Sequence, residues 1–206
     1  MKFVKSGLLS IIAAIHLAGC AVGGKTGPAV TVYDFGLPAA PLSADRAWSL
    51  LALEVDAPNW AKAPNVDYRL AYDEALELRQ YAYSRWAGAP GDLLARHLRQ
   101  QLGAVAASAN VAWNCRLTVD LQEFSQVFDT PEQSRGVVQA MVHLVDAQRQ
   151  LLAEKKMRVA TPAPTPDAEG GVHALLAAST GMGQQIADWL ATLPDDDRLR
   201  SCRTGA

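Results

Sequence analysis

The sequence has no excess of charge of one sign. Its 206 residues include 19 Lys and Arg against 21 Asp and Glu, a formal net charge of −2. A nucleic-acid-binding protein concentrates basic side chains to neutralise phosphates, and this composition offers no such excess. Beyond the N-terminus no apolar run approaches the roughly 20 residues of a membrane-spanning helix. Nucleic-acid binding and a later helical span are therefore not expected.

Residue types that catalyse reactions or bind metals are also scarce. No histidine has a second histidine or a cysteine at metal-ligand spacing; the four are His16, His97, His143 and His173. No Gly-x-Ser-x-Gly segment is present to hold a serine nucleophile. We therefore expect no catalytic residues, no metal and no cofactor, although carboxylates from separate elements leave a tethered enzyme as an alternative.

Two short segments have a chemical and a structural interpretation. Gly181-Met182-Gly183 lacks the third glycine and the preceding strand of a dinucleotide loop, so close packing of a helix explains it better. The run Asp195-Asp196-Asp197 has carboxylates for a cation, but adjacent charges near a terminus more often form a solvated tail.

The N-terminus has the order of a bacterial lipoprotein signal. Lys2 and Lys5 precede the uncharged run 8–17, and Leu17-Ala18-Gly19-Cys20 resembles a lipobox. Small residues let a peptidase approach the backbone, and a thiol accepts the diacylglycerol. We predict that residues 1–19 are cleaved and that Cys20 carries the lipid, palmitate among its acyl chains. The alternative is an ordinary secretory signal with an unrelated cysteine.

Lipidation would attach the chain to a membrane, since each buried methylene contributes about 0.8 kcal/mol and several acyl chains give stable anchoring. Ala21 and Val22 follow Cys20 where a retention aspartate would stand in enterobacterial lipoproteins. That resemblance predicts the outer membrane, periplasmic face. Residues 20–30 form the lipidated terminus and a Gly-rich tether, 31–194 the domain and 195–206 a polar tail.

The sequence has only three cysteines. With Cys20 acylated, Cys115 and Cys202 remain in an oxidising compartment and can form only one intramolecular pair. A bridge would fasten the C-terminal tail to the start of a strand. Two separate thiols are the alternative.

Apolar periodicity predicts a single domain. Strands are expected over 30–35, 48–55, 66–72, 76–83, 115–129, 137–148 and 151–160. Helices are expected after Pro90 and after a cap at Asp167, the second ending at Pro194. A change of phase near Gln122 predicts a bulge. The fold class is α+β: a largely antiparallel β-sheet with two main helices packed on one face.

The stretch YAYSRWAGAP, residues 81–90, has two interpretations. Tyr81, Tyr83 and Trp86 are able to pack as core under the first helix, with Arg85 paired to Asp67 or Asp73. Alternatively, the same four residues form an exposed surface for a partner or a second copy, because Trp, Tyr and Arg are enriched in binding hot spots. The sequence leaves both open.

These segments together resemble the ABC-type transport auxiliary lipoproteins, the paraquat-inducible protein C-like family. The resemblance covers about Val32 to Leu193. It is carried by Tyr33-Asp34-Phe35-Gly36, Tyr68-Arg69-Leu70 with Tyr72, Tyr81-x-x-Ser84-Arg85-Trp86-Ala87, Pro90 with Leu93-Leu94, Phe124-x-x-Val127-Phe128-Asp129 with Ser134, Asp167-Ala168, and Ile186-Ala187-Asp188-Trp189-Leu190. Ala89-Pro90 replaces paired prolines of the family, and its pattern does not include Cys115 or Cys202.

The resemblance implies a non-catalytic partner of a lipid-transporting ABC system with a permease, an ATPase and a periplasmic mammalian-cell-entry (MCE) protein. The lipoprotein would receive the MCE assembly at the outer membrane, support lipid transfer and envelope integrity, and self-associate, in some members as a ring. The alternative is an outer-membrane assembly lipoprotein unrelated to ABC transport.

Overall fold

The computed structural model describes residues 27–37, 41–42, 48, 51–107, 112–195 and 197–203. The predicted signal peptide, the lipidation site Cys20 and the middle residue of the predicted acidic run, Asp196, lie outside the described residues.

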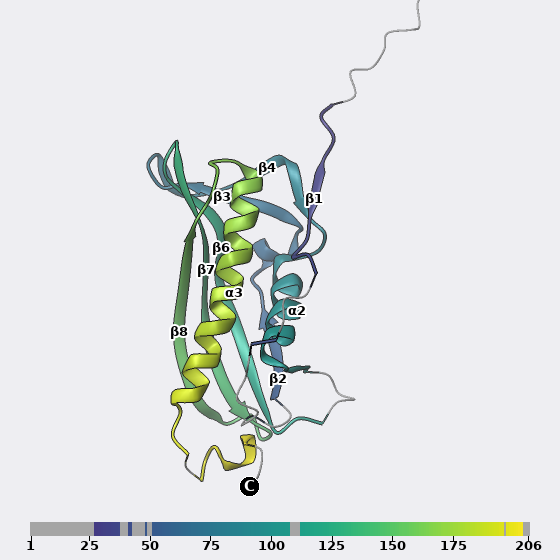
Figure 1. Ribbon diagram of the computed structural model, residues 1–206, viewed down its shortest axis with the longest axis vertical. Helices are drawn as coiled ribbons and strands as arrows, with labels where there is room; N and C mark the ends of the chain where they lie inside the picture. The colour runs from purple at the N-terminus through teal and green to yellow at the C-terminus, as the bar shows by residue number, and fades with distance from the viewer. Residues whose placement is uncertain are drawn as a thin grey trace, which may run out of the picture.

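Eight strands of the described chain form one mixed sheet (Figure 1). They are β1 (Thr31–Tyr33), β2 (Leu51–Asp56), β3 (Asn65–Leu70), β4 (Glu74–Trp86), β5 (Val105–Ala106), β6 (Cys115–Thr130), β7 (Gln133–Asp146) and β8 (Leu151–Pro162). The order is β1-β4-β3-β6-β2-β5, with β7 on the other edge of β6 and β8 outside β7.

The long strand β6 organises this sheet. One edge pairs antiparallel with β7 along nearly its whole length. The other edge is shared: residues 115–120 pair in parallel with β2, and 126–128 pair in parallel with β3. The register with β7 shifts between Leu121 and Glu123, which confirms the bulge predicted near Gln122. β2 and β3 therefore meet β6 on either side of that bulge.

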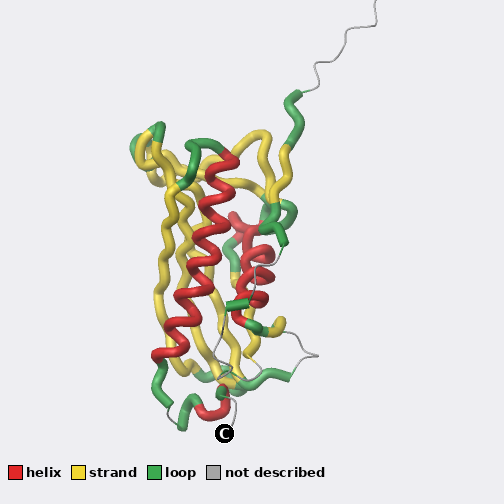
Figure 2. The backbone as a smooth tube through the Cα atoms, in the orientation of Figure 1, coloured by secondary structure: helices red, strands yellow, loops and turns green. Residues whose placement is uncertain are grey.

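Two helices cover one face of the sheet, as the sequence predicts (Figure 2). Helix α2 (Pro90–Leu102) has proline at its first turn and ends at Gly103, whose φ of 65° is the left-handed conformation that glycine adopts readily. Helix α3 (Ala168–Thr192) begins at Asp167, whose Oδ1 accepts a hydrogen bond from the Gly170 amide at 2.8 Å. The predicted cap and the predicted proline start are both confirmed.

The helices approach the sheet and each other closely at glycines. A Cβ on Gly136 of β7 would lie 2.5 Å from the backbone of Ala174 in α3, so only glycine fits. A Cβ on Gly183 would lie 2.1 Å from Oε1 of Gln101 in α2. The Gly181-Met182-Gly183 segment is thus a helix-packing surface, in agreement with the structural interpretation of its sequence.

Several boundaries differ from the predicted ones. β7 begins at Gln133, four positions before the expected 137, because the chain reverses tightly after Thr130 and pairing resumes at once. Trp48 lies outside β2 and instead forms an isolated bridge with Arg203. The two-residue β5 and the short helical turns η1 (Asn59–Lys62) and η2 (Arg200–Cys202) are too brief to leave a periodic pattern.

A disulfide joins Cys115 to Cys202, with their Cα atoms 5.3 Å apart. Cys115 opens β6 and Cys202 ends η2, and both are fully buried. The bridge therefore fastens the C-terminal segment to the central strand.

Candidate docking surface

Strand β4 carries the YAYSRW segment and separates its side chains between two environments. Trp86 is 2% exposed and packs edge-on against Phe35 and Phe124, with ring centroids at 5.6 and 5.9 Å. Such aromatic contacts stabilise a core beyond the area that they bury. Trp86 is therefore a core residue, in line with the first interpretation of the segment.

Tyr81 is partly buried and links three strands. Its hydroxyl donates to Oε1 of Gln126 at 2.9 Å, and its ring lies 4.6 Å from that of Tyr68. Nε2 of the same Gln126 donates to Oγ of Ser134 at 2.7 Å. Burial raises the pKa of the Tyr81 phenol above its ordinary value, so the hydroxyl stays a donor at neutral pH. Tyr81 supports the sheet and is not a free surface group.

Arg85 and Tyr83 lie in environments that differ from those of Trp86 and Tyr81. Nη1 of Arg85 donates to the carbonyls of Tyr81 and Ser84, at 2.5 and 2.8 Å. The predicted ion pairs of Arg85 with Asp67 or Asp73 are absent from the described residues. Asp73 pairs with Arg79 instead, and Arg85 affects Asp67 only by lowering the pKa of its carboxyl. Tyr83 is 52% exposed and is the one side chain of the predicted four that lies mainly in solvent.

A more exposed apolar group lies at the tip of the β3–β4 hairpin, which projects from one end of the domain (Figure 1). Leu76 is 89% exposed and Tyr72 is 48% exposed. Burial of such a leucine by a partner would contribute about 1.5–3 kcal/mol to association. The sequence pattern predicts only that a strand begins at Leu76, and its exposure follows from the hairpin.

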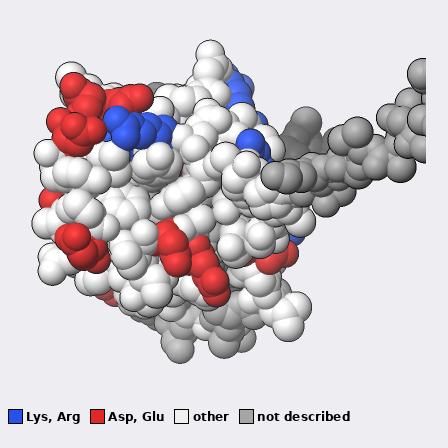
Figure 3. All heavy atoms as spheres, turned by 90° about the horizontal axis from the view of Figure 1, so that it is seen from above, with Lys and Arg blue, Asp and Glu red and all other residues white. Residues whose placement is uncertain are grey.

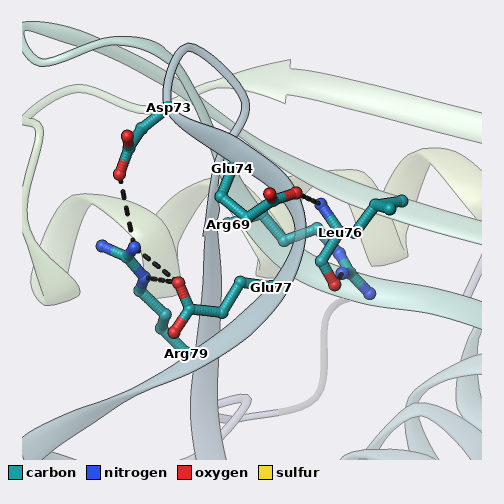
Figure 4. A network of polar contacts seen from close by, with 6 residues as sticks. All are labelled: Arg69, Asp73, Glu74, Leu76, Glu77 and Arg79. Atoms are coloured by element: carbon teal, nitrogen blue, oxygen red, sulfur yellow. Dashed lines mark hydrogen bonds and ion pairs between the residues drawn. The ribbon is translucent and has the colours of Figure 1, made fainter.

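Polar contacts hold the backbone that carries Leu76 (Figure 4). Arg69 of β3 reaches across the hairpin, and its Nη1 donates to the Leu76 carbonyl at 3.2 Å. Oε1 of Glu74 accepts the Leu76 amide at 3.0 Å. Both polar groups of the Leu76 backbone are therefore occupied while its side chain remains free to contact another molecule.

Acidic side chains lie around the tip of the same hairpin. Arg79 lies between Glu77 and Asp73, at 2.5 and 3.3 Å, and the hydrogen bond that Arg79 donates to Glu77 raises the pKa of the guanidinium. Viewed from above, acidic and basic side chains lie together at one corner of the molecule, and separate acidic patches lie elsewhere on the same face (Figure 3). The hairpin tip thus combines an exposed leucine with a charged rim.

Below the tip, Asp67 of β3 is 4% exposed, although it alternates with Val66 and Tyr68 in a pattern typical of a polar strand face. Burial and the nearby Glu123 raise its pKa to about 6, against the opposing effects of Arg69 and Arg85. Within the described part of the chain, its Oδ1 has no hydrogen-bond partner. The curved junction of β3 with β6 encloses this carboxyl, which local periodicity does not reveal.

The described residues offer little for catalysis. They contain no group of three or more His, Cys, Asp or Glu side chains placed to hold a metal ion. His97 is buried, which lowers its pKa, and its Nε2 lies 3.1 Å from Oγ1 of Thr180. That contact ties α2 to α3. Within the same residues, no helix is both long and apolar enough to cross a bilayer.

The fold is a single α+β domain from which the supported β3–β4 hairpin projects. Residues 35–187 match the model of the ABC-type transport auxiliary lipoprotein component. This match spans well over half of the chain, and the protein belongs to that family. The resemblance found in the sequence is thereby confirmed. No curated protein matches the chain.

Solved structures share the fold. A crystal structure of a Xanthomonas campestris protein of family DUF330 is similar with a TM-score of 0.64 and 19% identity, over 77% of this chain and 94% of that one. Another, of an uncharacterized protein, is similar with a TM-score of 0.62 and 19% identity, over 79% and 99%. The α+β class with its largely antiparallel sheet and two helices is confirmed.

Proposed function

We propose that this protein is the non-catalytic outer-membrane subunit of an MCE-type ABC lipid transport system. Acylated Cys20 holds it on the periplasmic face, and its domain docks the periplasmic MCE protein. In this role it supports lipid transfer between membranes and envelope integrity, and copies of it self-associate. The observation that carries the proposal is the family match over residues 35–187.

The β3–β4 hairpin is the docking element in this proposal. Leu76 supplies an apolar anchor, and anchors of this kind dominate binding when a partner encloses them. Asp73, Glu74 and Glu77 surround it, and because among the described residues Arg79 alone pairs with Asp73 and Glu77, the rim keeps an excess of negative charge. A partner surface with an apolar pocket and a basic rim would be complementary in both respects.

Support for a docking role also comes from how the hairpin is held. The contacts of Arg69 and Glu74 fix the Leu76 backbone before any partner binds. A preformed element loses less conformational entropy on association than a mobile loop does. The hairpin is thus better suited to recognition than an unsupported turn of the same sequence.

Affinity purification of the full-length lipidated protein after crosslinking in cells tests the proposal. We expect mass spectrometry to recover an MCE-domain protein together with its permease and ATPase. Recovery of an outer-membrane assembly complex in their place would favour the assembly lipoprotein, and recovery of the lipoprotein alone would argue against both. Leu76→Asp is the matched variant, because it changes an exposed side chain and leaves the backbone contacts in place.

A further inference from the structure

A second apolar surface lies at the sheet edge, where β1 pairs in parallel with β4. Val30, Val32 and Tyr83 are 52%, 62% and 52% exposed. Register places Val32 beside Arg85, and paired residues of a ladder point to the same face. Tyr83, two positions before Arg85 on β4, shares that face, and the exposed Val30 immediately precedes β1. The opposite face directs Trp86 into the core.

Arg85 adds a positive charge to this edge surface. Its Nη1 donates to two backbone carbonyls, and among the described residues no carboxylate lies within ion-pair distance of it. Two aliphatic side chains, a tyrosine and an arginine that forms no ion pair among the described residues make a combination suited to the bilayer interface. There tyrosine sits at headgroup level and basic side chains meet lipid phosphates.

This surface lies close in the chain to Cys20, the predicted site of the lipid anchor. Val30 follows Cys20 by ten positions, which span at most about 35 Å when fully extended. Three exposed side chains are far fewer than the roughly 20–30 residues a side of a stable protein interface. A short tether compensates for such weakness, because it keeps the local concentration of lipid high.

We propose that Val30, Val32 and Tyr83 insert into the headgroup region of the bilayer that holds acylated Cys20, with Arg85 facing lipid phosphate. This inference rests on the lipid anchor of the proposed function. The contact limits rotation of the domain about its tether and so gives the hairpin a fixed direction. The surface acts as a second, reversible attachment besides the acyl chains.

The test uses the full lipidated protein in vesicles of phosphatidylethanolamine and phosphatidylglycerol that include a nitroxide-labelled phospholipid. A polarity-sensitive fluorophore is attached to the thiol introduced by Val32→Cys, with the Cys115–Cys202 bridge oxidised. Leu151→Cys is the matched control, since Leu151 is 50% exposed and opens β8. Flotation of the vesicles first establishes that the protein is attached.

We expect blue-shifted, nitroxide-quenched emission from the probe at position 32, and unshifted, unquenched emission from the probe at position 151. Emission at position 32 that matches the control would overturn the inference while leaving the anchor and the docking proposal intact. A blue shift that is not quenched and disappears when the protein is diluted in the vesicles would assign the surface to a second copy instead. Failure to float would refute the anchor and this inference together.

Discussion

Arg69 and Glu123 form an ion pair that joins the hairpin to the central strand: Nε of Arg69 lies 3.1 Å from Oε2 of Glu123. Both side chains are about four-fifths buried, at 22% and 21% exposure. The same guanidinium donates to the Leu76 carbonyl. One residue therefore connects the exposed tip to β6, across the point where β2 and β3 diverge.

Replacement of Arg69 should consequently weaken both the fold and the hairpin. Arg69→Gln leaves the Glu123 carboxylate poorly solvated and without its cation, which costs about 2–3 kcal/mol in a partly buried setting. Urea denaturation would measure the loss of unfolding free energy. Hydrogen exchange should quicken at the Leu76 region, because its carbonyl loses a donor.

Arg135→Gln is the control for this change. Arg135 pairs with Asp129 at 2.8 Å, but at 30% and 46% exposure water solvates both partners. We expect a loss of no more than about 1 kcal/mol, as for exposed ion pairs generally. Equal losses for Arg69→Gln and Arg135→Gln would contradict the supporting role of Arg69.

The buried Asp67 predicts an unusual pH dependence. Its pKa is about 6 in the folded protein against an ordinary 3.8, so the folded state binds more protons between these values. The free energy of unfolding should therefore fall as pH rises from about 4 to 6, by roughly 2–3 kcal/mol. Thermal melts of the wild type and Asp67→Asn across this range would measure it.

Asp67→Asn removes the titrating group but keeps its shape, so the variant should be the more stable protein at pH 7 and lose this slope. Asp129 and Asp167 have lowered pKa values, owing to hydrogen bonds from Arg135 and from the Gly170 amide respectively. Their stabilisation is lost only as pH falls below about 4. Parallel pH profiles for the wild type and Asp67→Asn would show that Asp67 is not the cause.

Trp86 and Tyr83 lie three positions apart and should respond differently to truncation. Trp86→Ala empties a packed site among Phe35 and Phe124, and we expect a loss of about 3–5 kcal/mol in unfolding free energy. Tyr83→Ala removes an exposed ring and should change stability by less than about 0.5 kcal/mol. Chemical denaturation of both variants would measure these changes in unfolding free energy. Comparable losses of unfolding free energy for Trp86→Ala and Tyr83→Ala would place Tyr83 in the core as well.

The disulfide should stabilise the fold through the chain that it closes. Cys115 and Cys202 are 87 positions apart, and the chain-entropy model gives roughly 4–5 kcal/mol for such a loop. Reduction, or Cys202→Ser, should lower the melting temperature markedly. Thiol titration of the unreduced, unfolded protein should find neither cysteine free. Two reactive thiols would show that the bridge does not form in the cell.

Local rules predicted much of this fold. Pro90 and Asp167 set the helix starts through backbone geometry and a single hydrogen bond, and the phase of apolar residues placed the bulge at Gln122. The parallel contacts of β6 with both β2 and β3 join segments far apart in the chain. No local pattern encodes such pairing, because it depends on which strands reach the same edge.

The candidate surface was harder to predict. Tyr81, Tyr83, Arg85 and Trp86 have the composition of a binding site, yet their environments range from core to solvent within one strand. Leu76 has no distinguishing sequence feature, and its exposure follows from the projection of the hairpin beyond the sheet. Asp67 stands at a polar position of an alternating strand pattern and yet is enclosed where β3 joins β6.

The most direct measurement of the docking role is site-specific photocrosslinking in cells. A photoreactive amino acid replaces Leu76 in the full-length protein, and Leu151, exposed at the start of β8, receives the same group as control. The account predicts a covalent product with the periplasmic MCE protein from position 76 and none from position 151. Crosslinks to that protein from neither position, or equally from both, would contradict docking through the β3–β4 hairpin.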